Sequence, residues 1–368
     1  MAKLIYVDLN HWIRFARGRL GRPGSERYRQ VFEQLMAARA AKRIVVPLSS
    51  THYIEMSRIR DPRQRAEVAL TMEALSEYVA LTSREVLLRD ELRRSIASEF
   101  GMAYETPRPA ITGFGYADAF GQDQVRGHIT GNLDQARRHA DAAADRVIRG
   151  LETKMGHGWR FRPSGTARDK LQLIEEAMNA AMQFGILRGP QDADIERLRQ
   201  EYGYRPEDSY AVTHAIENRE AELARLLAKG EARRERLDDI IAARAMYWDL
   251  GDQWARASTD LRLPVRDVVE LGKDTLSRII NGVPIIDVES ALRRGNFRNG
   301  TYTWSTNDIY DLSFVGTAVV YSDVVLTENH VRAQLVQQGV DRKYGTLMPR
   351  RIEDTAAWLQ EIPREATN

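Results

Sequence analysis

The sequence predicts an α/β protein: a parallel sheet flanked by helices and interrupted by a large all-helical insertion. Near the N-terminus, two apolar strand-like runs joined by a helical stretch form a βαβ pattern. Strand-like and helical segments alternate again near the C-terminus, whereas helix formers dominate the middle. We therefore expect residues 1–85 and 274–368 to join in one sheet and residues 86–273 to form the insertion.

The N-terminal part follows the βαβ pattern closely. The strand at 4–7 ends at Asp8, and a helix over 26–42 places its apolar residues at helical spacing before a second strand at 43–49. Ser49 or Ser50 is a suitable N-cap, so Glu55 falls in the first turns of the next helix. A helix over 62–76 and a short strand over 78–83 complete this part.

The middle of the chain has the composition of a helical bundle. Its expected helices cover 84–100, 133–154, 167–184, 192–202, 206–228, 233–260 and 266–280. The stretch TPRPAITGFGYADAFGQDQ is rich in Gly and aromatic residues and predicts a long loop, because its glycines match no phosphate-binding pattern. Simple scaffolding is the first reading of the insertion, beside a lid, a dimerisation arm or an inhibitory surface.

The C-terminal part returns to the α/β pattern. Residues 283–294 predict a short strand or the start of a helix, and a helix over 307–318 leads to a strand over 323–329. A last strand over 346–350 and a helix over 352–362 close the chain. Asp323, at the head of its strand, is expected to cap or to pair with a cation.

Composition excludes several classes of protein. Hydrophobic residues at 43% and charged residues at 29% are typical of globular proteins, and the absence of cysteine excludes disulfides, thiolate zinc sites and cysteine nucleophiles. No apolar run approaches the roughly 20 residues that cross a bilayer, and the N-terminus lacks a signal-peptide pattern. We expect a cytoplasmic protein without a membrane partner, in which any bound metal has oxygen ligands.

Carboxylates recur where the predicted strands end. Asp8 ends the first strand, Glu55 follows the second, Asp308 and Asp311 begin a late helix, and Glu328 ends the late strand. Each acid alone also fits a bland role as a cap or a solvated surface group. The carboxyl ends of parallel strands meet at one sheet edge, however, and clustered carboxylates need a cation to stay ionised together. The pattern therefore favours Mg²⁺ or Mn²⁺ and phosphodiester hydrolysis.

Arginines follow the first two acids. Net charge is only +2, so no global field indicates a nucleic-acid partner. A high-GC codon bias explains the excess of arginine over lysine as well as a phosphate-binding role does. If the arginines bind phosphate, the side chains that would hold the nucleic-acid backbone are those of Arg14, Arg17, Arg19 and Arg22. A further group of arginines, Arg58 to Arg65, follows Glu55.

Three segments of the chain resemble PIN-like nucleases, which are metal-dependent ribonucleases with a Rossmann-like sheet. They are YVDLN, VVPLSSTHYIEM and NDIYDLSFVGTAVVYSDVVLTEN. The resemblance implies that Asp8, Glu55 and Asp311 bind the metal and that Glu328 occupies the fourth acidic position. It also implies supporting roles for Asn10 and Thr327. Asp308 competes with Asp311 for the third place, because residues three apart share one helix face.

The function that we expect from this resemblance is a Mg²⁺- or Mn²⁺-dependent endoribonuclease, such as a toxin or defence effector, that acts on RNA. An inhibitory or activating protein partner and a homo-oligomer are compatible with the long insertion. Two alternatives stay open: a catalytically silent scaffold that binds protein or RNA, and a metal-dependent DNA nuclease or phosphatase that uses the same acids.

Overall fold

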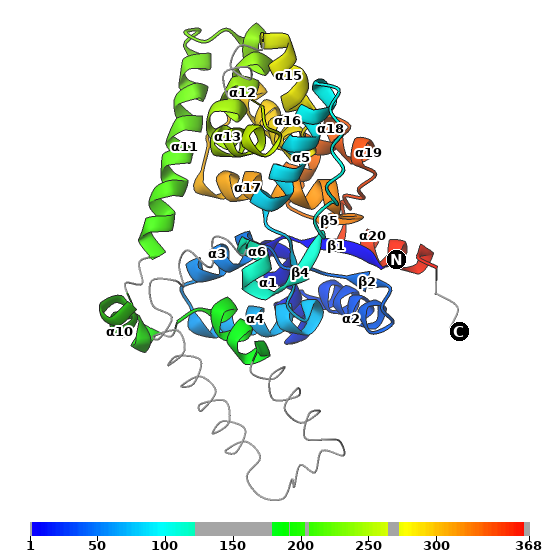
Figure 1. The fold of residues 1–368 in the computed structure, drawn as a ribbon. Helices are drawn as coiled ribbons and strands as arrows, with labels where there is room; N and C mark the ends of the chain where they lie inside the picture. Colours follow the sequence, from blue (N-terminus) through cyan, green and yellow to red (C-terminus); the bar gives the residue numbers. More distant parts are fainter. Residues whose placement is uncertain (1, 122–178, 191, 203–205, 264–271, 364–368) are drawn as a thin grey trace, which may run out of the picture.

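The chain folds into three layers, with a sheet between two layers of helices (Figure 1). The computed structural model describes residues 2–121, 179–190, 192–202, 206–263 and 272–363. The helix expected over 133–154, and most of the one expected over 167–184, lie outside the described residues. None of the described helices is both long and apolar enough to span a membrane.

The central sheet is parallel, as the βαβ pattern predicts. Strand β1 lies between β2 and β5, with Lys3 opposite Ile44 and Ile5 opposite Val324. Parallel bridges from Leu48 to Ala80 and from Val324 to Leu347 extend it on both sides. The strands are β1 (Lys3–Val7), β2 (Ile44–Val45), β5 (Val324–Leu326) and an antiparallel pair, β3 (Val79–Leu81) with β4 (Thr112–Phe114). The predicted α/β class is confirmed at this level.

Alternate residues of β1 face opposite helical layers. Ile5 and Val7 belong to one buried core and Tyr6 to the other, as the two-residue period of a strand requires. The first layer contains α1 (Leu9–Arg19), α2 (Glu26–Ala40), α3 (Ser50–Arg58), α4 (Pro62–Ser76) and α20 (Ile352–Glu361). The second contains α16 (Pro284–Arg298), α17 (Thr306–Tyr321), α18 (Asn329–Gln337) and α19 (Val340–Tyr344).

Helices from the middle of the chain stack on this second layer. Leu223 and Ile241 join the core around Tyr6, and a third core forms where α16 meets three of these helices around Leu92 and Ile279. The described helices of the middle part include α5 (Arg84–Glu99), α10 (Asp192–Tyr202), α11 (Pro206–Ala228), α12 (Leu237–Arg244), α13 (Gly251–Asp260) and α15 (Lys273–Asn281). Figure 1 shows α5, α11, α12, α13 and α15 on one side of the sheet and α1, α2 and α4 on the other, with α10 outside the stack.

The loop expected over 106–124 contains regular structure, so that prediction was wrong for part of the stretch. Its described part forms β4 and a short helix, α6 (Gly115–Phe120), which returns to the first layer. Gly115 adopts φ +70°, and this left-handed turn lets Tyr116 and Phe120 pack against Tyr53. Long-range packing of three aromatic rings therefore organises a segment whose composition suggests a loop.

Two further segments differ from expectation. The helix expected over 233–260 is divided into a 3₁₀ turn (Arg234–Arg236), α12, a π turn (Ala245–Asp249) and α13. Gly251, a poor helix former, follows the π turn, in which the Leu250 N–H donates to the Ala245 carbonyl at 2.9 Å. The strand expected over 346–350 is reduced to the single bridge at Leu347, and the ambiguous segment 283–294 is helical.

Buried ion pairs connect the middle helices to α16. Glu220 of α11 is 1% exposed, and its Oε1 lies 3.0 Å from Nη2 of Arg244 and 3.4 Å from Nε of Arg293. Nη1 of Arg293 also donates to Oδ2 of Asp249 at 2.7 Å. These charges depend on one another, because Glu220 is almost fully removed from water and both arginines share it as a partner.

Glu220→Ala is therefore expected to lower the free energy of unfolding by about 3–5 kcal/mol, because it leaves two arginines without their shared partner. Urea denaturation measures the change. The matched control is Glu222→Ala on the same helix, which removes an exposed pair with Arg225 and should leave the denaturation midpoint unchanged. Equal midpoints for the two variants would contradict a structural role for the buried pairs.

Candidate metal centre

Asp8 lies where β1 ends and α1 begins. Its backbone N–H donates to the Leu326 carbonyl of β5 at 2.9 Å, and its residue is only 3% exposed. The side-chain Oδ2 is buried and has no hydrogen-bond partner among the described residues. A buried, unpartnered carboxylate oxygen is costly unless a cation or water satisfies it. This atom is the strongest sign that the chain binds something here.

Glu55 is brought to Asp8 by the local structure of α3. His52, one turn earlier and fully buried, donates from Nε2 to the Val7 carbonyl at 2.7 Å and accepts the Ser49 N–H at Nδ1 at 2.8 Å. Burial lowers the pKa of His52 to about 4, so the ring stays neutral and its two nitrogens keep these opposite roles. His52 thus ties the start of α3 to the residue before Asp8.

Asp311 enters the same cavity from α17, which lies beside α3. Thr51 and Ser313 are hydrogen-bonded through their hydroxyls at 3.2 Å, and the Arg58 guanidinium stacks over the Tyr310 ring at 4.6 Å. Asp311 lies in the second turn of α17. The contact between α3 and α17 therefore brings Glu55 and Asp311 together, although they are 256 positions apart in the chain.

Glu328 completes the group of acids from the end of β5. It is the N-terminal boundary residue of α18, and its Oε1 accepts a hydrogen bond from Nδ2 of Asn10. Glu328 and Asn10 line a cavity of about 240 Å³ together with Asp8, Glu55, Asp311, Arg58 and Asn307. The structure thus brings four of the five predicted acids, and Asn10, into one cavity.

The acids of this cavity raise one another's pKa. Burial first, and then the charge of Glu328, raise the pKa of Asp8 to about 7. Burial and the charge of Asp8 raise the pKa of Glu55 to about 8, and burial with the charges of Asp8, Glu328 and Glu55 raises the pKa of Asp311 to about 9. Like charges in a desolvated site disfavour full ionisation. Near neutral pH the group retains protons unless positive charge is supplied.

Arg58 lies at the acid cavity, although sequence reasoning left it outside the predicted site. It lines the cavity, lowers the pKa of Glu55 by its charge, and donates to Oδ1 of Asn307 at 3.4 Å. The signal was present in the sequence, because Arg58 follows Glu55 by three positions and therefore shares its helix face. It is a cation held at the wall of an acidic site.

Asp308 has a different position from Asp311. Its Oδ2 accepts hydrogen bonds from the N–H and the hydroxyl of Ser305 at 2.7 and 2.6 Å, and Oδ1 accepts one from the Tyr302 hydroxyl. These contacts form a capping box at the start of α17, and Asp308 does not line the acid cavity. The structure thus places Asp308 outside the acid cavity, with Oδ2 engaged in the cap and Oδ1 bonded to Tyr302, so its predicted metal-binding and catalytic role stays a prediction that this placement does not favour.

The other predicted residues divide between a neighbouring cavity and the surface. Arg14 and Thr327 line a second cavity that adjoins the first. Arg17 and Arg19 are exposed and line neither cavity, and Arg22 pairs with Glu67 at 3.3 Å. Of the four predicted backbone-binding arginines, only Arg14 is therefore placed beside the acids. Asp323 pairs with Lys3 at 2.7 Å, as a capping or pairing role predicts.

The donor set suits a hard divalent cation. All four acids offer oxygen, and Mg²⁺ is commonly held by one or two carboxylates while it keeps several waters. Within the described residues, no three His, Cys, Asp or Glu side chains are close enough to form a complete ligand set as they stand. A site in which waters complete the coordination therefore fits better than a closed protein cage, and the unpartnered Oδ2 of Asp8 is the first candidate ligand atom.

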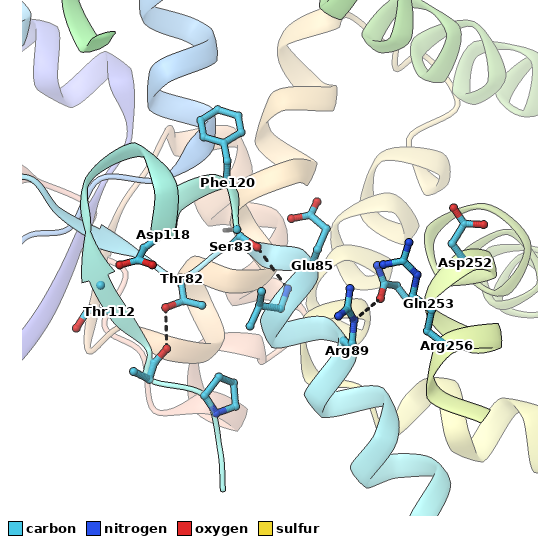
Figure 2. A pocket seen from close by; sticks show the side chains of 15 residues that line it. Thr82, Ser83, Glu85, Arg89, Thr112, Asp118, Phe120, Asp252, Gln253 and Arg256 are labelled. Carbon is cyan, nitrogen blue, oxygen red and sulfur yellow. Dashed lines mark hydrogen bonds between the residues drawn. The ribbon is translucent and has the colours of Figure 1, made fainter. Parts of the chain in front are cut away.

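A larger cavity of the described chain lies elsewhere. It occupies about 710 Å³ between the start of α5, the β4–α6 segment and α13, and none of the four acids lines it. Figure 2 shows its charged groups dispersed around the walls, with Arg89 hydrogen-bonded to Gln253 at 3.0 Å. Asp118, also visible there, accepts the Phe114 N–H at 2.7 Å. Its charges are mixed in sign, so it does not share the chemistry of the acid cavity.

The raised pKa values predict how stability depends on pH without metal. Between about pH 4 and about pH 9 the native acids hold protons that the unfolded chain has released, so stability falls as pH rises through this window. We expect the Tm to fall from about pH 5 to about pH 9, and Mn²⁺ to restore it at the upper end. Asp311→Asn should flatten the pH profile. A wild-type Tm that rises with pH, measured by calorimetry in chelator, would contradict the arrangement.

A second measurement distinguishes the roles of Asp308 and Asp311. Asp308→Ala removes the cap of α17 and should lower the free energy of unfolding by about 0.5–2 kcal/mol, with unchanged Mn²⁺ affinity. Asp311→Ala should weaken Mn²⁺ binding without this loss of stability, because it removes a repelling charge. Titration calorimetry measures Mn²⁺ affinity and urea denaturation measures stability for both variants. Weaker Mn²⁺ binding in Asp308→Ala, with unchanged binding in Asp311→Ala, would assign the metal to Asp308.

Comparison with known proteins gives no relative on which to base a function. No family model matches the chain, and neither does any curated protein or solved structure. The resemblance of the three segments to PIN-like nucleases therefore stays a prediction, and the functional argument depends on the geometry of the acid cavity.

Proposed function

We propose that this protein is a metal-dependent nuclease that hydrolyses RNA phosphodiester bonds. One observation carries the proposal: four carboxylates from four separate segments line one cavity, and the most buried of them, Asp8, has an oxygen without a partner. A protein core does not gather repelling charges without a counter-charge. A divalent cation supplies the positive charge that such a cavity lacks, and the bound cation can in turn attract a phosphate.

The side chains have separate roles in this proposal. Asp8, Glu55 and Asp311 are the residues that would hold Mg²⁺ or Mn²⁺. When bound, such an ion activates water and neutralises charge that develops on a phosphate. Glu328 has Oε1 occupied by Asn10, which leaves Oε2 to accept the proton that an attacking water loses. Glu328 is also the most exposed of the four acids, as a group that exchanges protons with solvent must be.

Arg58 gives the cavity its own positive charge. The stacking on Tyr310 and the hydrogen bond to Asn307 hold its guanidinium at the cavity wall. An arginine in this position binds a phosphate oxygen and stabilises the additional negative charge of the transition state. Arg58 therefore contributes to phosphate chemistry, whereas a site that only stored metal would not need it.

A catalytically silent scaffold is the second candidate, because no complete three-residue ligand set is formed by the described side chains. Titration with Mn²⁺ separates the two candidates. A nuclease should bind Mn²⁺ and lose this binding in Asp8→Asn, whereas a silent scaffold should show no site that depends on Asp8. A DNA nuclease or a phosphatase is distinguished by offering single-stranded DNA and small phosphate esters as substrates.

Purified protein is expected to cleave single-stranded RNA in the presence of Mn²⁺. Asp8→Asn and Asp311→Asn should each lower the rate by at least about 100-fold, since metal ligation supplies several kcal/mol of transition-state stabilisation. Gel analysis of end-labelled RNA measures the rates. Asp354→Asn is the matched control, because this exposed acid caps α20 and lies outside the cavity. Cleavage at the wild-type rate by both cavity variants would identify a contaminating nuclease.

A further inference from the structure

A second cavity, of about 310 Å³, adjoins the acid cavity. The two share Asn10 and Glu328, so the hydrogen bond between these residues forms part of the wall between them. The second cavity has the opposite character: its lining includes Arg14, Arg350 and Arg351, and Glu328 is its one acidic side chain among the described residues. A cation-seeking site and an anion-seeking site thus lie side by side.

The three arginines reach this cavity from distant parts of the chain. Arg14 comes from α1, whereas Arg350 and Arg351 follow the segment that bridges to β5. There the Val325 N–H donates to the Leu347 carbonyl, and the Leu347 N–H donates to the Asp323 carbonyl, both at 2.9 Å. Because the bridge is parallel, the chain after Leu347 leaves the sheet at the edge where β5 delivers Glu328.

The charges of this cavity are available for a ligand. The Tyr28 hydroxyl accepts a hydrogen bond from Nη1 of Arg14 at 2.9 Å, which orients that guanidinium. Arg350 is exposed and forms no hydrogen bond or ion pair with any residue that the structure describes. Uncompensated arginines that converge on one cavity favour an anion with several oxygens, because a guanidinium binds phosphate through two parallel hydrogen bonds.

A buried polar atom supports the same assignment. Thr327 lines this cavity, is 6% exposed, and its Oγ1 has no hydrogen-bond partner among the described residues. His11 lies beside it, with Nε2 at 3.3 Å from the Thr327 carbonyl, and burial lowers its pKa to about 4. The cavity therefore combines arginine charge with an unused hydroxyl, which is the donor set of a phosphate site rather than of a metal site.

We propose that this arginine cavity binds the backbone phosphate next to the scissile one in single-stranded RNA. The proposal rests on the proposed nuclease function, because it requires that a neighbouring phosphate occupy the acid cavity. The shared wall of Asn10 and Glu328 means that a chain spanning both cavities presents successive phosphates to them. Binding at the arginine cavity would then fix which phosphate of the RNA strand lies at the acids. The acid cavity cannot fix this position by itself, because its carboxylates repel phosphate.

Binding of a short fluorescent single-stranded RNA, followed by anisotropy in chelator so that the RNA stays intact, tests the proposal. Arg350→Ala should weaken binding about tenfold, as expected for the loss of a charge-assisted hydrogen bond. It should also reduce the slope of log Kd against log salt by about 0.7, the value for one phosphate contact on a single strand. Arg350→Lys should retain the salt slope, since it keeps the charge. Arg342→Ala, an exposed arginine of α19 outside both cavities, is the control and should match the wild type.

RNAs that carry one neutral methylphosphonate linkage make the test specific to a phosphate. At one linkage, the neutral substitution should weaken wild-type binding and abolish the difference between wild type and Arg350→Ala. Wild-type affinity of Arg350→Ala at every salt concentration would overturn the proposal, even if the protein cleaves RNA. An Arg350 effect in a protein that cuts no RNA would instead overturn the nuclease function and leave the phosphate site standing.

Discussion

The crowding of carboxylates at the carboxyl edge of the sheet is the constraint on which the site depends. Asp8, Glu55, Asp311 and Glu328 share a cavity, and three of them have pKa values raised by burial and by one another. Repulsion of this kind lowers stability at neutral pH. A fold retains such an arrangement only where the surrounding structure fixes it and where bound positive charge compensates for it.

The surrounding structure fixes the acids through the backbone. Asp8 is held by its N–H bond to Leu326, and the neutral ring of His52 connects the end of β1 to the start of α3. These bonds involve main-chain atoms and leave Oδ2 of Asp8 without a partner among the described residues. A site whose acids were held by side-chain pairs, as Asp323 is held by Lys3, would have no charge left to bind a cation.

Sequence patterns predicted the fold class and the position of the site because both follow from local rules. Strand ends and helix starts place Asp8, Glu55, Asp311 and Glu328 without knowledge of distant contacts. The choice between Asp308 and Asp311 was not accessible from helix spacing, since both lie on one face. The capping pattern of Ser305 with Asp308 favours Asp311, because the Asp308 carboxylate is already engaged at the helix start.

Sequence patterns did not predict the features that depend on long-range packing. Strand β4 and α6 are stabilised by the packing of Tyr116 and Phe120 against Tyr53. Arg350 lies close to the acids because the bridge at Leu347 holds its segment beside β5. Neither contact leaves a periodic signal, so the Gly-rich segment was predicted to be a loop and the strand predicted over 346–350 is longer than the single bridge that forms.

The helical middle of the chain is coupled to the site through α17. Thr306 donates to Glu217 of α11 at 2.9 Å, and Thr213 of α11 lies 3.4 Å from the Tyr310 hydroxyl, on whose ring Arg58 stacks. The buried pairs around Glu220 then anchor α11 to α16. Scaffolding is thus a specific role here: α11 supports the helix that carries Asp311 and the ring that orients Arg58. A change in the position of α11 would reach the acid cavity through these two contacts.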